Sequence, residues 1–74
     1  MPNTAHVMRA AARTLRAAAL ELPDDAPRSR IRRRAAKLAH VQAIMGRSTA
    51  SRRIGAEAAD RHNMIAHILE TRGR

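Results

Sequence analysis

The chain has 74 residues, enough for one domain, and its 15 Lys and Arg residues against six acidic residues give a formal net charge of +9 at pH 7. The absence of Cys excludes disulfides and thiolate metal sites, and the absence of Phe, Tyr and Trp excludes the aromatic platforms on which single-stranded nucleic acids stack. A chain this basic is expected to attract phosphate-rich molecules or acidic protein surfaces.

The spacing of apolar residues predicts an all-α three-helix bundle in a single domain, residues 1–74, with no strand. The first predicted helix covers about residues 4–22. It ends at the turn between Pro23 and Pro27, because a residue that precedes proline disfavours the helical conformation. Its apolar face is expected to consist of Met8, Ala11, Ala12, Leu15, Ala18, Ala19 and Leu22.

The second predicted helix covers about residues 29–45. Ser29 is expected to cap its amino end, and Gly46 ends it at a position where glycine serves as a C-terminal cap. Its apolar face is expected to consist of Ile31, Ala35, Leu38 and Met45, with Val41 at the edge.

The third predicted helix covers about residues 50–71, capped by Ser48 or Thr49, and a basic tail of residues 72–74 follows it. Gly55 lies inside this helix, where it is expected to permit close packing against a neighbour. The apolar face is expected to consist of Ile54, Ala58, Ile65, Ile68 and Leu69.

Alanine is the commonest residue, and large aliphatic side chains are few. A fully buried aliphatic side chain contributes roughly 1.5–3 kcal/mol, whereas ordering each residue costs roughly 1.5 kcal/mol. The balance for one copy is close to zero, so we expect a homodimer or a fold that depends on a partner. A marginally stable monomer is the alternative.

The strongest functional signal is a run of six cations within residues 28–37 that contains no acid. Like charges one turn apart destabilise a helix, and a polyanion bound there would relieve that cost. The run therefore predicts a helix that contacts phosphates, while a solvated face is the alternative. Its cations are Arg28, Arg30, Arg32, Arg33, Arg34 and Lys37. A second basic ridge, of Arg9, Arg13 and Arg16, follows the first helix, and the sequence leaves open whether the two ridges join.

The segment from the second helix through Gly46 into the third has the length of a helix-turn-helix. In that interpretation the amino end of the third helix approaches base edges, next to Arg47 in the turn; the residues it offers are Thr49, Ser51, Arg52 and Arg53. An ordinary antiparallel helical hairpin is the alternative, because Arg47 stands where the motif usually has an apolar residue.

The C-terminal Arg72-Gly73-Arg74 resembles the core of AT-hook peptides and of related actinobacterial nucleoid-protein tails, although the flanking Pro or Gln of that family is absent. The resemblance covers three residues. It implies that Arg72 and Arg74 lie in a narrow A·T-rich minor groove. A cationic tail that contacts no groove is the alternative.

No other pattern predicts a reaction. The four histidines lack the spacing of a zinc protease, no glycine-rich phosphate loop is present, and Glu57 and Asp60 have no partner histidine. We expect no catalytic residue, no metal, no cofactor and no membrane segment, and we expect a cytoplasmic location. The predicted function is binding of duplex DNA by a small regulatory or architectural protein. The alternatives are a module that docks on an acidic protein and a protein that binds structured RNA.

Overall fold

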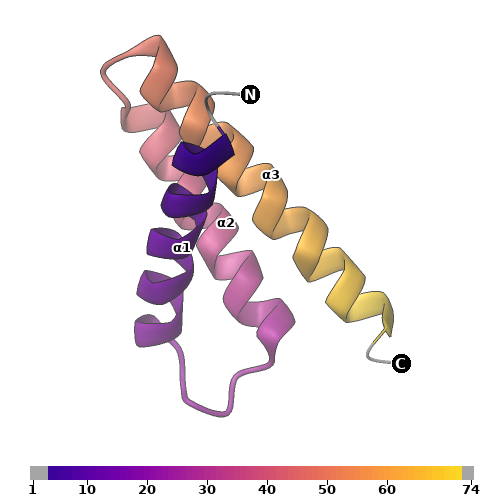
Figure 1. The fold of residues 1–74 in the computed structure, drawn as a ribbon. Helices are drawn as coiled ribbons and strands as arrows, with labels where there is room; N and C mark the ends of the chain where they lie inside the picture. Colours follow the sequence, from indigo (N-terminus) through magenta and orange to yellow (C-terminus); the bar gives the residue numbers. More distant parts are fainter. Residues whose placement is uncertain (1–3, 73–74) are drawn as a thin grey trace.

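A computed structural model describes residues 4–72, and most of this part of the chain is helical (Figure 1). Helix α1 covers Thr4–Glu21, α2 covers Arg28–Met45 and α3 covers Thr49–Arg72. The predicted all-α arrangement of three helices is confirmed, and every observed boundary lies within one residue of the predicted one. Of the predicted basic tail, Gly73 and Arg74 lie outside the described residues.

Helices α1 and α3 run in the same direction, and α2 runs antiparallel to both (Figure 1). The contacts between α2 and α3 extend along most of their length, since Gly55 packs on Ala43 near one end and Arg33 bonds to Glu70 near the other. The two helices therefore pack against each other as an antiparallel pair. Helices α1 and α3 diverge toward the end of the bundle where α1 joins α2 (Figure 1).

The ends of α2 differ from the sequence prediction. No side chain caps its amino end; the residue before it is Pro27, whose carbonyl accepts hydrogen bonds from the backbone N–H groups of Arg30 and Ile31 at 3.0 and 3.1 Å. The prediction that Ser29 is the N-cap is wrong, because Ser29 already lies in the first turn. Gly46 does end the helix, but in an extended conformation. Glycine is needed there for its small size and not for its backbone freedom, since a Cβ at this position would lie 3.0 Å from the Cγ of Arg52.

The amino end of α3 follows the prediction. The Ser48 hydroxyl oxygen accepts a hydrogen bond from the backbone N–H of Ser51 at 3.0 Å, which is the geometry of an N-cap. The connection between α2 and α3 comprises residues 46–48 alone.

The core consists mainly of alanines, and the predicted apolar faces are partly wrong. Met8, Met45 and Ile68 were assigned to the core, yet their side chains are 49%, 75% and 41% exposed. The reason is that the helices approach each other so closely along alanine stripes that the larger side chains lie at the flanks. The central cluster comprises Ala10, Ala11, Ala39, Ala58 and Ala59, with Ile54 packed against it.

Gly55 allows the closest approach between α2 and α3. A Cβ at this position would lie 2.9 Å from the Cα and 3.0 Å from the Cβ of Ala43. These distances are shorter than van der Waals contact, so only glycine fits without a displacement. The predicted role of Gly55 in close packing is confirmed.

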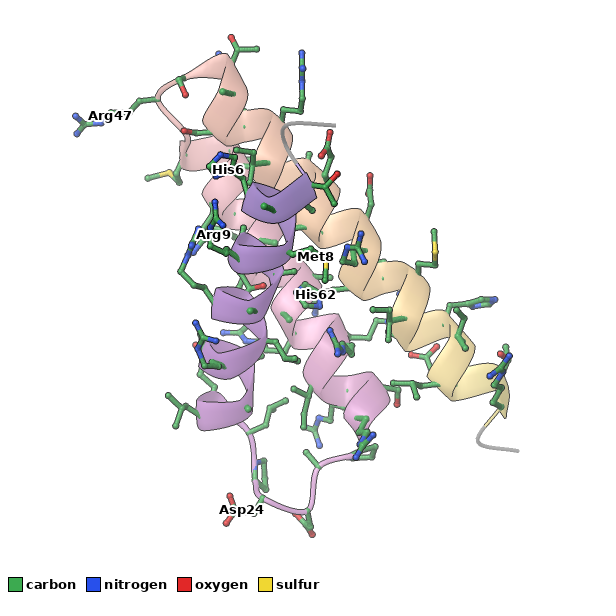
Figure 2. All side chains as sticks on the ribbon, in the orientation of Figure 1. His6, Met8, Arg9, Asp24, Arg47 and His62 are labelled. Atoms are coloured by element: carbon green, nitrogen blue, oxygen red, sulfur yellow. The ribbon has the colours of Figure 1, made fainter. Side chains whose placement is uncertain are left out.

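The largest fully buried side chains are polar, namely His62 of α3 and Thr14 of α1. Figure 2 shows His62 pointing inward among the three helices. Its Nε2 lies 2.9 Å from the carbonyl oxygen of Ala11 and 2.8 Å from the Thr14 hydroxyl, and its Nδ1 lies 3.2 Å from Nη1 of Arg32. Because arginine only donates, Nδ1 accepts, and the hydrogen of the neutral ring is on Nε2.

The charge state of His62 follows from the same surroundings. Burial lowers the pKa of the imidazole most, and the charges of Arg32 and Arg61 lower it further, against an opposing effect of the hydrogen bond to Ala11. His62 is therefore a neutral hydrogen-bonding group that ties all three helices together. Its position inside the bundle was not predicted from the sequence.

Candidate nucleic-acid interface

The structure divides the acid-free run of α2 between two faces of the helix. On the outer face four of its cations, together with Glu21 and Leu22, line a shallow hollow; these cations are Arg30, Arg33, Arg34 and Lys37. Arg28 and Arg32 instead line a cavity between the three helices. The six residues therefore do not form one continuous surface.

Two cations of the outer face are held by carboxylates from neighbouring helices. Arg33 donates from Nε and Nη2 to the two carboxylate oxygens of Glu70, both at 3.0 Å, and from Nη1 to the Asn63 side-chain oxygen at 3.1 Å. The pair lowers the pKa of the Glu70 carboxyl and raises that of Arg33. Arg34 donates from Nε to Glu21 at 2.6 Å. Four cations and two carboxylates leave two net positive charges on this face.

The other cations of the run have no carboxylate partner among the described residues. Within residues 4–72, Arg28, Arg30 and Lys37 are exposed and form no ion pair, and half-buried Arg32 contacts the neutral ring of His62. The first turn of α2 contains no acid and no side-chain cap. Cations in this turn are repelled by the positive end of the helix dipole, and no acid within the turn offsets that repulsion.

A second positive region surrounds the turn between α2 and α3. Arg47, Thr49, Arg52 and Arg53 are all exposed, and the first turn of α3 contains no acid. Figure 2 shows Arg47 pointing away from the bundle. The 18 residues of α2 separate this region from the start of the run by about 27 Å, at the ~1.5 Å rise of an α-helix.

The basic ridge of α1 lies partly beside this second region. Arg9, Arg13 and Arg16 are exposed, and Arg9 donates a hydrogen bond to Nδ1 of His6 at 2.9 Å; both residues are labelled on α1 in Figure 2. Arg13 lines a hollow together with Gln42 of α2 and Ser51 of α3. The ridge is thus brought toward the turn end of the bundle and away from Arg28.

Arg72 lies at the other end of α3, where it is exposed in the last turn. The contact between Glu70 and Arg33 places this end beside the amino half of α2. Arg74, the second arginine of the predicted minor-groove contact, lies outside the described residues.

Glu21, Asn63, Glu70 and His62 shape the charge of this surface, and none was identified from the sequence. Each meets a partner at least 13 positions away in the chain. One signal was present: if Gly55 is placed opposite Ala43 in an antiparallel hairpin, Arg33 falls opposite residues near 65. Counting outward from that pair would have brought Glu70 within reach of Arg33.

No helix among residues 4–72 has a stretch of the length and hydropathy needed to cross a membrane. The same residues contain no group of three or more His, Cys, Asp or Glu side chains that could hold a metal ion. Comparisons of the chain with models of protein families, with curated proteins and with solved structures found no match.

Proposed function

We propose that this protein binds duplex DNA, as a small regulatory or architectural protein, through the cations that have no carboxylate partner. The observation that carries the proposal is the acid-free run on α2, in which Arg28, Arg30 and Lys37 are exposed and unpaired among the described residues. Phosphates at the start of α2 would relieve the repulsion among these cations and their conflict with the helix dipole.

The contacts are made mainly to the phosphate backbone. Each phosphate neutralised by Lys or Arg releases condensed counterions, which drives binding without sequence readout. The chain has no aromatic side chain on which unpaired bases could stack, so the duplex is favoured over single strands.

The turn between α2 and α3 supplies a second contact region. Arg47, Arg52 and Arg53 bind phosphates there, and the Thr49 hydroxyl adds a polar contact at the amino end of α3. A helix-turn-helix mode, in which this end of α3 reaches base edges, is supported by the three-residue connection 46–48 and by the exposure of these side chains.

A homodimer is part of the proposal. Val41, Ile44 and Met45 lie on one face at the carboxyl end of α2, and they are 56%, 66% and 75% exposed. Two copies of α2 packed antiparallel through these side chains bury them and keep the two cation runs at opposite ends. The resulting dimer presents two basic surfaces to one duplex.

The test is a salt series with duplex DNA, in which log K falls with log[salt] at a slope of about −0.9 for each phosphate neutralised. The variant Arg30→Gln with Lys37→Gln removes two unpaired cations of the run, and we expect it to flatten the slope by about two units. The matched control, Arg16→Gln with Arg61→Gln, removes the same charge from exposed positions elsewhere. Equal flattening by both variants would show attraction to net charge alone, and absence of DNA binding at low salt would overturn the proposal.

A complementary pair of variants raises the charge. Glu21→Gln with Glu70→Gln frees Arg34 and Arg33 from their carboxylates, and we expect tighter DNA binding and a steeper slope. Glu57→Gln with Asp60→Asn adds the same net charge on α3, where neither carboxylate forms an ion pair among residues 4–72. Only the first variant is expected to change the slope by more than one unit. Parallel titrations with duplex RNA determine whether the duplex must be DNA.

Light scattering tests the dimer. We expect Ile44→Glu to shift the mass to the 8.2 kDa of a single chain, whereas Met64→Glu, at a position with the same 66% exposure, leaves the dimer intact. A wild-type mass of 8.2 kDa at high concentration would contradict the dimer.

A further inference from the structure

The diverging ends of α1 and α3 leave an apolar cavity of about 400 Å³, half open to solvent, at the end of the bundle where α1 joins α2. Helix α1 contributes Leu15 and Ala19 to its lining, α2 contributes Ile31, and α3 contributes Ile65 and Leu69. The volume is within the range of sites that bind small molecules or anchoring side chains. Its large aliphatic side chains pack on one another only in part, since each of the four is half-buried.

Two cations and no acid complete the lining of the cavity. They are Arg28 and Arg32, one helical turn apart on α2. Arg32 is oriented by its hydrogen bond to Nδ1 of His62, which leaves its other guanidinium donors available. The site therefore combines an apolar interior with a rim that suits carboxylates.

We propose that this cavity binds an acidic amphipathic helical segment of a partner protein. Two large apolar side chains of that segment, spaced by one turn, fill the cavity as anchors. Asp or Glu residues beside the anchors bind Arg28 and Arg32. The spacing follows from the lining, because Leu15 and Ala19, like Ile65 and Leu69, are each separated by four residues, or one turn.

The charges select this occupant over two others. A second copy of the chain brings a net charge of +9 to a site that has two cations and no acid, so like charges would meet. Duplex DNA has phosphates for Arg28 but no flexible apolar group to enter the cavity. Only a segment that has both acids and apolar anchors matches both parts of the lining.

The inference goes beyond DNA binding and does not depend on it. Arg28 belongs to both proposals, but the DNA experiments change only Arg30 and Lys37 on the outer face of α2, whereas the experiments below change residues that line the cavity. Failure of one proposal therefore leaves the other intact.

The probe is a fluorescein-labelled, Ala-rich helical peptide with two Leu residues four positions apart and Glu residues beside them, and binding is followed by fluorescence anisotropy. We expect Arg28→Gln to raise its Kd about tenfold, as the loss of a charged contact commonly does. The matched control Arg47→Gln lowers the net charge equally at an exposed position in the turn between α2 and α3, and we expect its Kd to change less than twofold.

Comparison peptides and a cavity-filling variant complete the test. A peptide with both Leu residues replaced by Ala, and one with the Glu residues replaced by Lys, are expected to bind at least about tenfold more weakly. Ala19→Leu narrows the cavity from its rim and is expected to weaken binding while the chain stays folded. Equal affinity for the Leu and Ala peptides, an equal effect of Arg28→Gln and Arg47→Gln, or unchanged binding by Ala19→Leu would each overturn the proposal.

Discussion

The two ends of the bundle differ in how closely their helices pack. At the end near the α2–α3 turn, the backbones at Gly55 and Ala43 lie so close together that a Cβ added to Gly55 would be 2.9 Å from the Cα of Ala43. At the other end, Leu15, Ile31 and Ile65 line a cavity of about 400 Å³. Small residues close one end and larger residues leave the other open, because a wide side chain holds helices apart unless another side chain fills the remaining space.

The difference between the two ends shows that the hydrophobicity of the residues does not by itself decide where the core of the bundle lies. At the closed end the contact between α2 and α3 is made by glycine and alanine, whereas the open end has aliphatic side chains for which one copy of the chain provides too few neighbours. The closed end is therefore expected to dominate stability, and the open end to tolerate or accept added groups.

The largest expected effect comes from breaking the closed end. Gly55→Val places a branched side chain where even a Cβ lies 2.9 Å from the Cα of Ala43. Overpacking of this kind costs about 3 kcal/mol of unfolding free energy, which chemical denaturation followed by far-UV circular dichroism will measure. Ala56→Val, at the exposed neighbouring position, is the control and is expected to cost less than about 1 kcal/mol. Equal costs would refute the close contact.

The next effect concerns His62, which lies between the two ends. We expect His62→Gln to lower the unfolding free energy at neutral pH by about 2 kcal/mol, because a fully buried hydrogen-bonded group is lost. His67→Gln removes an exposed imidazole and is expected to change little. A comparable loss in both variants would contradict the structural role of His62.

The pH dependence of stability isolates the same residue. The unfolded chain protonates His62 near pKa 6.5, whereas the pKa of the folded chain is lower, so below 6.5 the unfolded state binds more protons. The unfolding free energy therefore falls as the pH decreases through this window. Glu70, with a pKa lowered from 4.5, acts at lower pH than this. Denaturation between about pH 8 and pH 5 should show the slope in the wild type and a flatter one in His62→Gln.

The smallest effect comes from the open end and has the opposite sign. Ala19 is exposed at the rim of the cavity, so Ala19→Leu adds apolar volume there, and cavity-filling changes stabilise proteins by about 1 kcal/mol. Ala17→Leu is the control for helix propensity, since Ala17 is also exposed on α1 but does not line the cavity. If Ala19→Leu gave no more stability than Ala17→Leu, the cavity would not be an unfilled part of the core.

Much of the fold was predictable from the sequence, but much of the site was not. The Pro23–Pro27 turn and Ser48 mark helix ends through local chemistry, so the helix boundaries agree within a residue. The apolar faces were predicted less well. The prediction assumed that the most hydrophobic side chains are buried, whereas burial in this bundle depends on how closely the helices approach each other. The acid-free run is a local property of the sequence, and the helical period alone sets which of its cations share a side of α2. The carboxylates and the cavity that these cations meet depend instead on where α1 and α3 pack against α2.

The sequence by itself determined three helices, their ends and a large excess of positive charge, because these follow from neighbouring residues and composition. Only the tertiary structure decided that Arg33 and Arg34 meet carboxylates, that His62 is buried and neutral, and that Arg28 and Arg32 border an apolar cavity. Each of these depends on residues far apart in the chain, which come together through the register of antiparallel helices. That register is decided by contacts as small as the one between Gly55 and Ala43.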